Sequence, residues 1–167
     1  LSEKSIGAYL AIEGDYDNAL QWLNRALEHF AEDDKNRADV YREIGVIYAR
    51  QGQYEPSMAN LKTARGIAQR LNDPQTLYKV IGNQGIVAFT QDKLQEALSY
   101  YNECQRVVES IPDKLGLAIV LGNKGNVFLG LNQLPQAHEA YQQYLILSLE
   151  LGFQQGVGIS LGNIGSV

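Results

Sequence analysis

YREIGVIYARQGQYEPSMANL, residues 41–61, contains the pattern that decides the fold. Gly45 in this stretch is one of five glycines, here called the ladder glycines, that recur along the chain. They are Gly7, Gly45, Gly85, Gly125 and Gly165, separated by 38, 40, 40 and 40 residues. A fixed period near 40 residues is typical of stacked repeats rather than of one globular core. The sequence therefore predicts an array of similar units.

The residues around the ladder glycines recur in the same register. Seven positions later come residue types that tolerate the left-handed backbone of a helix end, namely Gly14, Gly52, Asp92 and Asn132. Twelve positions later come small residues: Ala19, Ser57, Ala97 and Ala137. Sixteen positions later come bulky ones: Leu23, Leu61, Tyr101 and Tyr141. Each unit is therefore predicted to be a helix, a tight turn and a second helix that packs closely on the first.

Aspartates mark the predicted unit boundaries. Asp33, Asp73 and Asp113 each lie twelve positions before a ladder glycine, where they suit a helix N-cap. The repeats then cover about 1–33, 34–73, 74–113 and 114–153, with a half repeat at 154–167. Phe153 replaces the aspartate before the half repeat, and the first unit is shorter between Ala19 and its boundary, which predicts a short second helix there. We expect one array that is a fragment of a longer protein.

The opening stretch resembles the tetratricopeptide repeat (TPR) pattern. The resemblance is carried by Tyr41, Ile44-Gly45 and Tyr48, followed by Gly52, Tyr54 and Leu61. It covers essentially the whole chain, and the 40-residue period is similar to the longer-helix subclass found in kinesin light chains, G-protein-binding polarity adaptors and bacterial peptide-sensing regulators. The resemblance implies an all-α, right-handed superhelical solenoid of antiparallel helix pairs. It also implies that the first helix of each pair lines a concave groove.

Three Gly-Asn pairs, at residues 82–83, 122–123 and 162–163, precede the later ladder glycines. The family resemblance places Asn83, Asn123 and Asn163 toward the groove, where a carboxamide can both donate to and accept from a peptide backbone. The alternative is that each Asn bonds a neighbouring helix and only fixes the packing of repeats. Weaker candidates for the groove are Asn126, Lys79, Arg42 and Arg50, for which the alternative is an ordinary solvated helix face.

Two positions depart from the pattern. The residue before the ladder glycine is Ile in three units but Gln84 and Lys124 in the other two. A fully buried Lys is costly unless its ammonium group reaches water. We expect either looser packing there or side chains that reach the groove.

The sequence gives no sign of catalytic or metal chemistry. His29 and His138 lie on different repeats without a second ligand at metal-binding spacing. Cys104 occupies a helix position equivalent to Ala26 and Ala64, so we expect a small core residue there. No nucleophile elbow and no phosphate-binding loop is present. We expect neither an enzyme nor a cofactor.

Charge and hydropathy limit the partners. The net charge of −5 argues against nucleic acid or an anionic membrane surface as the main partner. No apolar run approaches the roughly 20 residues of a membrane span, and a cytoplasmic location is expected. Residues 125–167 contain no Lys or Arg.

The predicted function is a protein-interaction scaffold, or the regulatory arm of a larger protein, that binds a peptide or helix in the groove. Gly82, Gly122, Asn123 and Asn126 stand where the resemblance would require basic residues for a C-terminal carboxylate, so we expect an internal or helical segment as the ligand. Two alternatives remain open. One is a homo-oligomerisation module that associates through the terminal half repeat, and the other is a peptide-responsive sensor that gates an attached output domain.

Overall fold

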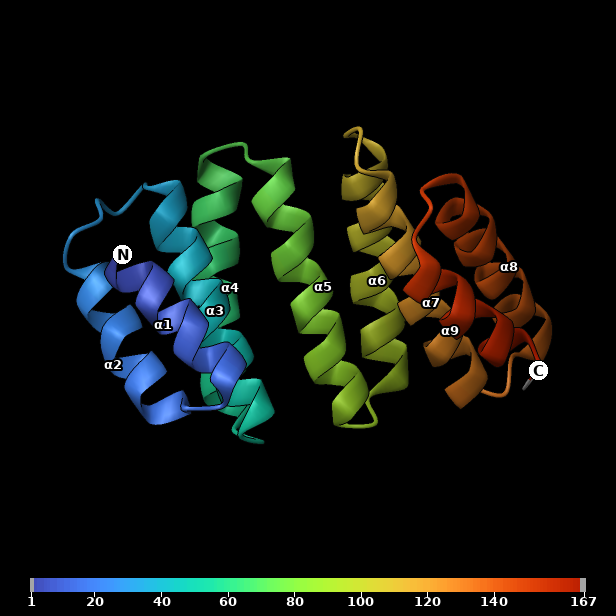
Figure 1. Ribbon diagram of the computed structural model, residues 1–167, viewed down its shortest axis with the longest axis horizontal. Coiled ribbons are helices and arrows are strands. Elements are labelled where there is room, and N and C mark those ends of the chain that lie inside the picture. The colour runs from blue at the N-terminus through green and yellow to red at the C-terminus, as the bar shows by residue number, and fades with distance from the viewer. Residues whose placement is uncertain (1, 166–167) are drawn as a thin grey trace. The chain divides into compact units, whose positions relative to one another are not determined.

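A computed structural model describes residues 2–165, and all regular secondary structure in this part of the chain is α-helical (Figure 1). The helices are α1 (Glu3–Glu13), α2 (Tyr16–Leu27), α3 (Lys35–Arg50), α4 (Tyr54–Arg70), α5 (Pro74–Thr90), α6 (Leu94–Glu109), α7 (Lys114–Gly130), α8 (Leu134–Glu150) and α9 (Gln154–Ile164). The odd-numbered helices are the first helices of the predicted pairs, and the even-numbered ones are the second helices. The predicted all-α helical repeat fold is confirmed.

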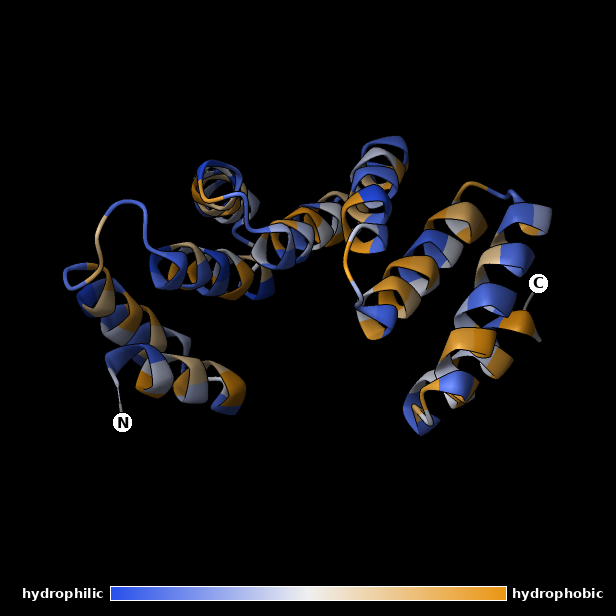
Figure 2. Cartoon of the chain, turned by 90° about the horizontal axis from the view of Figure 1, so that it is seen from above, coloured by the Kyte–Doolittle hydropathy of each residue, from blue (hydrophilic) through white to orange (hydrophobic). Residues whose placement is uncertain are grey.

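The chain divides into two compact units, Leu1–Val87 and Ala88–Val167. In unit 1, one buried cluster joins α1, α2 and α3 around Leu23, Val40 and Ile44, and another joins α4 and α5 around Leu61 and Val80. In unit 2, Ala118 and Leu121 of α7 pack with Tyr144 of α8. Hydrophobic and hydrophilic residues alternate along the helices (Figure 2), as expected for helices that each have a buried face.

The ladder glycines allow two helices to approach closely. A Cβ atom on Gly45 would lie 2.8 Å from Cγ of Leu61, and one on Gly125 would lie 2.3 Å from Cε1 of Tyr141. Gly7 has the same relation to Leu23, at 2.7 Å. The bulky residue sixteen positions after each of these glycines therefore covers it, as the spacing predicts.

The turns between the paired helices adopt the predicted left-handed backbone. The φ angles are 84° at Gly14, 74° at Gly52, 59° at Asp92 and 57° at Asn132. Residues other than glycine rarely adopt such φ angles, and among them Asn and Asp tolerate these angles best. The choice of residue at these four positions thus follows from the backbone of the turn.

Two of the three predicted N-cap aspartates cap their helices. The Asp73 and Asp113 carboxylates accept hydrogen bonds from the backbone N–H groups of Thr76 and Gly116, at the starts of α5 and α7. Before α3, however, the N-cap is Asp34, and the prediction of Asp33 is wrong by one residue. Asp33 instead forms an ion pair with Arg70 of α4.

The second helix of the first pair is short, as predicted. α2 has 12 residues, whereas α4, α6 and α8 have 17, 16 and 17. Before α9, Phe153 makes no side-chain capping bond, and its ring instead lies against Gly156 and in the cluster of unit 2.

Candidate functional site

On the first helix of a pair, two positions in the repeat register lie on the same face of the helix. They lie six and two residues before the ladder glycine, hence four residues apart on one helix face. We call them the stripe positions. The stripe residues are Asp39 and Glu43 on α3, Lys79 and Asn83 on α5, Ile119 and Asn123 on α7, and Ile159 and Asn163 on α9. The stripe therefore changes from charged on α3 to apolar and neutral on α7 and α9.

The three predicted asparagines lie at these positions with their side chains partly exposed. Asn83 belongs to unit 1, and Asn123 and Asn163 belong to unit 2. Within residues 2–165, none of the three carboxamides forms a side-chain hydrogen bond. No side-chain hydrogen bond in this part of the chain therefore ties the three carboxamides to a neighbouring helix.

Exposed isoleucines accompany the asparagines of unit 2. Ile119 is 46% exposed and Ile159 is 45% exposed. Each lies one helical turn before an Asn, so α7 and α9 present the same pair of an aliphatic side chain and a carboxamide. An aliphatic surface with a few oriented polar groups is the usual composition of a peptide-binding surface.

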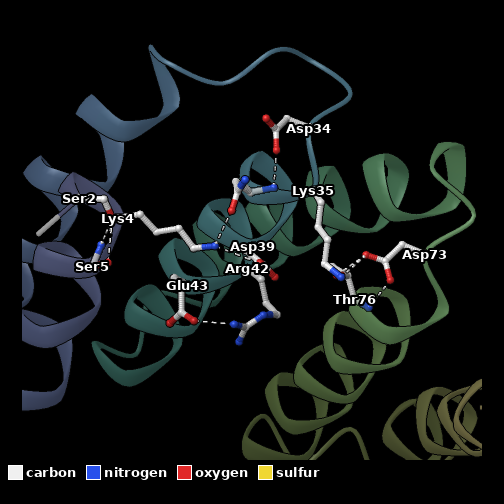
Figure 3. A network of polar contacts seen from close by, with 11 residues as sticks. Ser2, Lys4, Ser5, Asp34, Lys35, Asp39, Arg42, Glu43, Asp73 and Thr76 are labelled. Carbon is white, nitrogen blue, oxygen red and sulfur yellow. Dashed lines mark hydrogen bonds and ion pairs between the residues drawn. The ribbon is translucent and has the colours of Figure 1, made fainter. Parts of the chain in front are cut away.

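In unit 1 the corresponding surface is occupied by paired charges (Figure 3). Lys4 of α1 donates to Asn36 and forms an ion pair with Asp39, both at 3.1 Å. Arg42 pairs with the neighbouring Glu43. The stripe carboxylates of α3 are thus neutralised by side chains of this same unit.

A second ion pair of this network links α3 to the start of α5. Lys35 lies 3.2 Å from Asp73, which also accepts from the Thr76 hydroxyl at 2.7 Å (Figure 3). Burial raises the pKa of Asp73, but the hydrogen bonds from Thr76 and Lys35 outweigh it and leave the pKa below the ordinary value of 3.8. Asp73 therefore stays ionised and holds the start of α5.

The weaker groove candidates lie in different surroundings. The Arg42 side chain is half-buried, and its Nε is buried without a hydrogen-bond partner among the described residues. Arg50 donates to the Ala11 carbonyl at 3.3 Å, so it supports the end of α1. Lys79 is exposed, with its ammonium group 5.9 Å from the Tyr78 ring centroid.

Asn126 takes part in packing between helices. Its Oδ1 accepts a hydrogen bond from the Tyr141 hydroxyl at 2.8 Å, which joins α7 to α8. Tyr141 is the residue that covers the ladder glycine Gly125. Asn126 thus positions the ring that closes the helix pair, a role that the sequence reasoning did not anticipate.

The two departures from the ladder pattern are accommodated inside their units. Gln84 is 3% exposed, accepts from Arg65 at 3.3 Å and contacts Sδ of Met58 at 3.7 Å. Lys124 is half-buried and donates to Gln105 of α6 at 2.7 Å. Burial lowers the pKa of Lys124, although Glu109 and Glu139 oppose this effect.

Other predicted positions have structural surroundings. Cys104 is fully buried, as are the equivalent Ala26 and Ala64 to within 2% exposure. Between residues 2 and 165 there is no group of three or more His, Cys, Asp or Glu side chains arranged to hold a metal ion. No helix in that range is both long and apolar enough to cross a membrane.

The chain belongs to the tetratricopeptide repeat family, because residues 2–70 and 76–147 match that family. The predicted resemblance is thereby confirmed. No curated protein matches the chain.

Several solved proteins have similar folds, among them the following three. A signal transduction ATPase with numerous domains from Pyrococcus horikoshii, which has a tetratricopeptide repeat sensor, is 18% identical with a TM-score of 0.89, covering 98% of this chain and 25% of that one. Aspartyl phosphate phosphatase F from Bacillus subtilis is 16% identical with a TM-score of 0.85, covering 90% of this chain and 40% of that one. BtubC from P. vanneervenii is 16% identical with a TM-score of 0.81, covering 90% of this chain and 63% of that one. This chain thus spans less than two thirds of each.

Proposed function

We propose that the chain is a non-catalytic interaction module whose first helices bind a peptide or helical segment of a partner protein. The observation that carries the proposal is the Ile-Asn pair on both α7 and α9, with exposed isoleucines and with carboxamides that bond to no side chain within residues 2–165. A Rap protein of similar fold, at a TM-score of 0.80 and 16% identity, has been solved in complex with the competence and sporulation factor, which supports ligand binding by such a fold.

The ligand segment proposed for unit 2 is uncharged and partly apolar. The stripe residues of unit 2 are all uncharged, so they offer no ion pair to an acidic or a basic side chain. Ile119 and Ile159 favour aliphatic contacts, and Asn123 and Asn163 favour hydrogen bonds to the ligand backbone. Backbone recognition holds a segment without depending on the identity of every side chain.

The experiment begins with peptides selected on the immobilised chain from a random display library. Their dissociation constants are then measured by calorimetry with the double variant Asn123→Ala/Asn163→Ala. Each lost hydrogen bond is worth about 1 kcal/mol, so the affinity should fall about 30-fold while helicity and melting stay unchanged. Asn83→Ala is measured separately and should weaken binding about fivefold.

The matched control is Asn102→Ala/Gln142→Ala, which removes two exposed carboxamides from the second helices α6 and α8 of the same unit. It should leave the affinity within about twofold. Equal loss of affinity in the two double variants, or a loss of stability as large as the loss of affinity, would reject the stripe as the binding surface.

A sensor role is the second candidate, favoured by the likeness to the P. horikoshii protein along 98% of this chain. In that role, binding of the peptide changes the arrangement of the repeats and so controls an attached domain. Small-angle scattering of the chain with and without a selected peptide distinguishes the two roles, because a static scaffold gives superimposable profiles.

Self-association through α9 is the third candidate. Leu161 of α9 is 56% exposed, whereas Leu121, its equivalent on α7, is only 5% exposed. Light scattering over a range of protein concentrations tests this candidate, and a monomer at all concentrations rejects it.

A further inference from the structure

A cavity of about 540 Å³ opens in unit 1 where α2 has already ended. The last five residues of α4, Gly66–Arg70, match Glu28–Glu32 in the repeat register, and those five residues lie beyond the end of α2. The cavity is lined by Glu32 from this segment and by residues of α3 and α4. The short α2 therefore leaves a space that a longer second helix would partly fill.

The lining of the cavity is basic although the chain is acidic. It includes Arg37 of α3 together with Lys62 and Arg70 of α4, against a single carboxylate, Glu32, among the described lining residues. The net charge of the whole chain is −5. The three cationic side chains around the cavity are thus a local feature of unit 1.

The repeat fold itself does not require these cations. Eighty residues later, the matching positions on α7 and α8 hold Leu117, Gln142 and Glu150. The same helix pair therefore forms without the three positive charges. Of the two helix pairs, only α3 and α4 carry the three cations.

Arg37 is held in place by backbone carbonyls. Its Nη1 donates to the carbonyls of Leu27 and Phe30, at 2.8 and 2.9 Å, and its Nη2 donates to the Tyr41 hydroxyl at 3.4 Å. It thereby supports the end of α2 and contributes a fixed positive charge to the cavity. The Tyr41 hydroxyl accepts this bond and keeps its own hydrogen for another acceptor.

Lys62 and Arg70 can both bind a ligand. Lys62 makes no hydrogen bond or ion pair with residues 2–165. Arg70 pairs with Asp33 at 2.7 Å, but both side chains are more than half exposed, so this pair is weak and exchangeable. Gly66 has no side chain and so leaves open space in the wall of the cavity. A Cβ atom there would have one neighbour within 4 Å, Arg70 Nη1 at 3.7 Å.

We propose that this cavity binds a phosphate monoester. A phosphate group carries close to two negative charges at neutral pH and accepts several charge-assisted hydrogen bonds, which Lys62, Arg70 and the Tyr41 hydroxyl supply. The volume lies within the range of small-molecule sites, so an organic group fits beside the phosphate, against Ile67 and Tyr41. The site lies apart from the stripe positions and is independent of the function proposed above.

The test is a titration of the ¹⁵N-labelled chain, followed by NMR at constant ionic strength. The probes are inorganic phosphate, adenosine monophosphate and a phosphoserine peptide. All three should shift the amide signals of Lys62, Thr63, Gly66 and Arg70 in a saturable manner. Tighter binding of the nucleotide than of inorganic phosphate identifies a free metabolite as the ligand, and tighter binding of the peptide identifies a phosphorylated protein.

Variants separate binding from folding. Lys62→Gln and Arg70→Gln should each weaken binding about tenfold, because each removes a charge-assisted hydrogen bond. Gly66→Ile, which copies Ile146 of α8, keeps all charges but fills the opening, and should abolish saturable binding while helicity is retained. Arg106→Gln on α6 removes the same charge from unit 2 and should change the affinity less than about twofold. Absence of saturable shifts with every probe, or equal affinities of Lys62→Gln and the parent chain, would overturn the proposal.

Discussion

Helices α3 and α4 of unit 1 and helices α7 and α8 of unit 2 are built on the same register but present different surfaces. In both pairs a bulky residue covers a ladder glycine, Leu61 over Gly45 and Tyr141 over Gly125. Around this shared contact the residues diverge. Arg42 and Glu43 of α3 correspond to Gly122 and Asn123 of α7, and the basic residues beside the cavity correspond to Leu117, Gln142 and Glu150.

The difference separates what the repeat needs from what a ligand needs. The helix pair tolerates exchange of charge for apolar surface at the stripe positions, because these side chains lie outside the helix contact. A side chain at Gly45 or Gly125, in contrast, would collide with the residue that covers the glycine. Substitutions at matching positions of the two helix pairs therefore test which residues are needed for folding and which are needed only for ligand binding.

The largest effect is expected at the ladder glycines. Gly125→Ala places a methyl group 2.3 Å from Cε1 of the rigid Tyr141 ring, and should lower the free energy of unfolding by about 3 kcal/mol. Gly45→Ala meets the more adaptable Leu61 at 2.8 Å, and should cost about 1.5 kcal/mol. Urea denaturation followed by circular dichroism measures both changes.

Gly158 of α9 provides the control for this pair, since a Cβ atom there would have no neighbour within 4 Å. Gly158→Ala should stabilise α9 by about 0.5–1 kcal/mol through helix propensity. A smaller loss for Gly125→Ala than for Gly45→Ala would show that the Tyr141 ring moves aside more easily than the leucine.

A moderate effect is expected at the helix N-caps. Asp73→Ala removes the bonds to Thr76 and Lys35 at the start of α5, and should cost about 1 kcal/mol at neutral pH. Because the folded-state pKa of Asp73 lies below 3.8, its contribution is complete above that pH and is lost as the pH falls through the folded-state pKa. The difference between parent and variant, measured by thermal melting, should therefore shrink in acid.

Asp113→Ala gives the matching measurement at the start of α7, where the carboxylate accepts from the Gly116 N–H at 2.7 Å. A loss of similar size is expected at neutral pH. A difference for Asp73→Ala that stays constant down to the lowest pH would contradict the role assigned to its charge.

The smallest effect is expected at Lys124, which occupies the position of the buried Ile44 in the repeat register. Lys124→Met removes a desolvated ammonium group and should stabilise the chain by up to about 1 kcal/mol. The folded-state pKa of Lys124 is lowered, so the unfolded chain binds more protons between that pKa and 10.5. The stability of the parent should rise with pH in this window and approach that of the variant.

Lys114→Met is the control for Lys124→Met, since Lys114 on the same helix is 64% exposed and forms its ion pair, among the described residues, with the exposed Glu150. It should change stability by less than about 0.5 kcal/mol. Destabilisation by Lys124→Met would show that its bond to Gln105 outweighs the cost of burial.

Much of the fold follows from the sequence because backbone geometry restricts residue choice. The glycines, the small residues opposite them and the residues of the left-handed turns all report local geometry that few residue types satisfy. The N-cap of α3 was misplaced by one position, because Asp33 and Asp34 are both good caps. Only the ion pair with Arg70, 37 residues away, distinguishes them.

The candidate site was less accessible to sequence reasoning. The Gly-Asn pairs identify Asn83, Asn123 and Asn163, but the absence of hydrogen bonds to neighbouring helices appears only in three dimensions. Asn126 resembles these residues in sequence, yet the Tyr141 hydroxyl binds it. The basic cavity could not be predicted either, since it forms beyond the end of α2, between Glu32 and residues of two other helices.

The exposure of Leu161 has a consequence for hydrogen exchange. Ile81 and Leu121, the equivalent residues on α5 and α7, are at most 5% exposed, whereas Leu161 is 56% exposed. In a repeat array each helix is stabilised mainly by its immediate neighbours. The amide protons of α9 should accordingly exchange with solvent through local opening, faster than those of α7, and opening of unit 2 should begin at α9 and proceed toward α8.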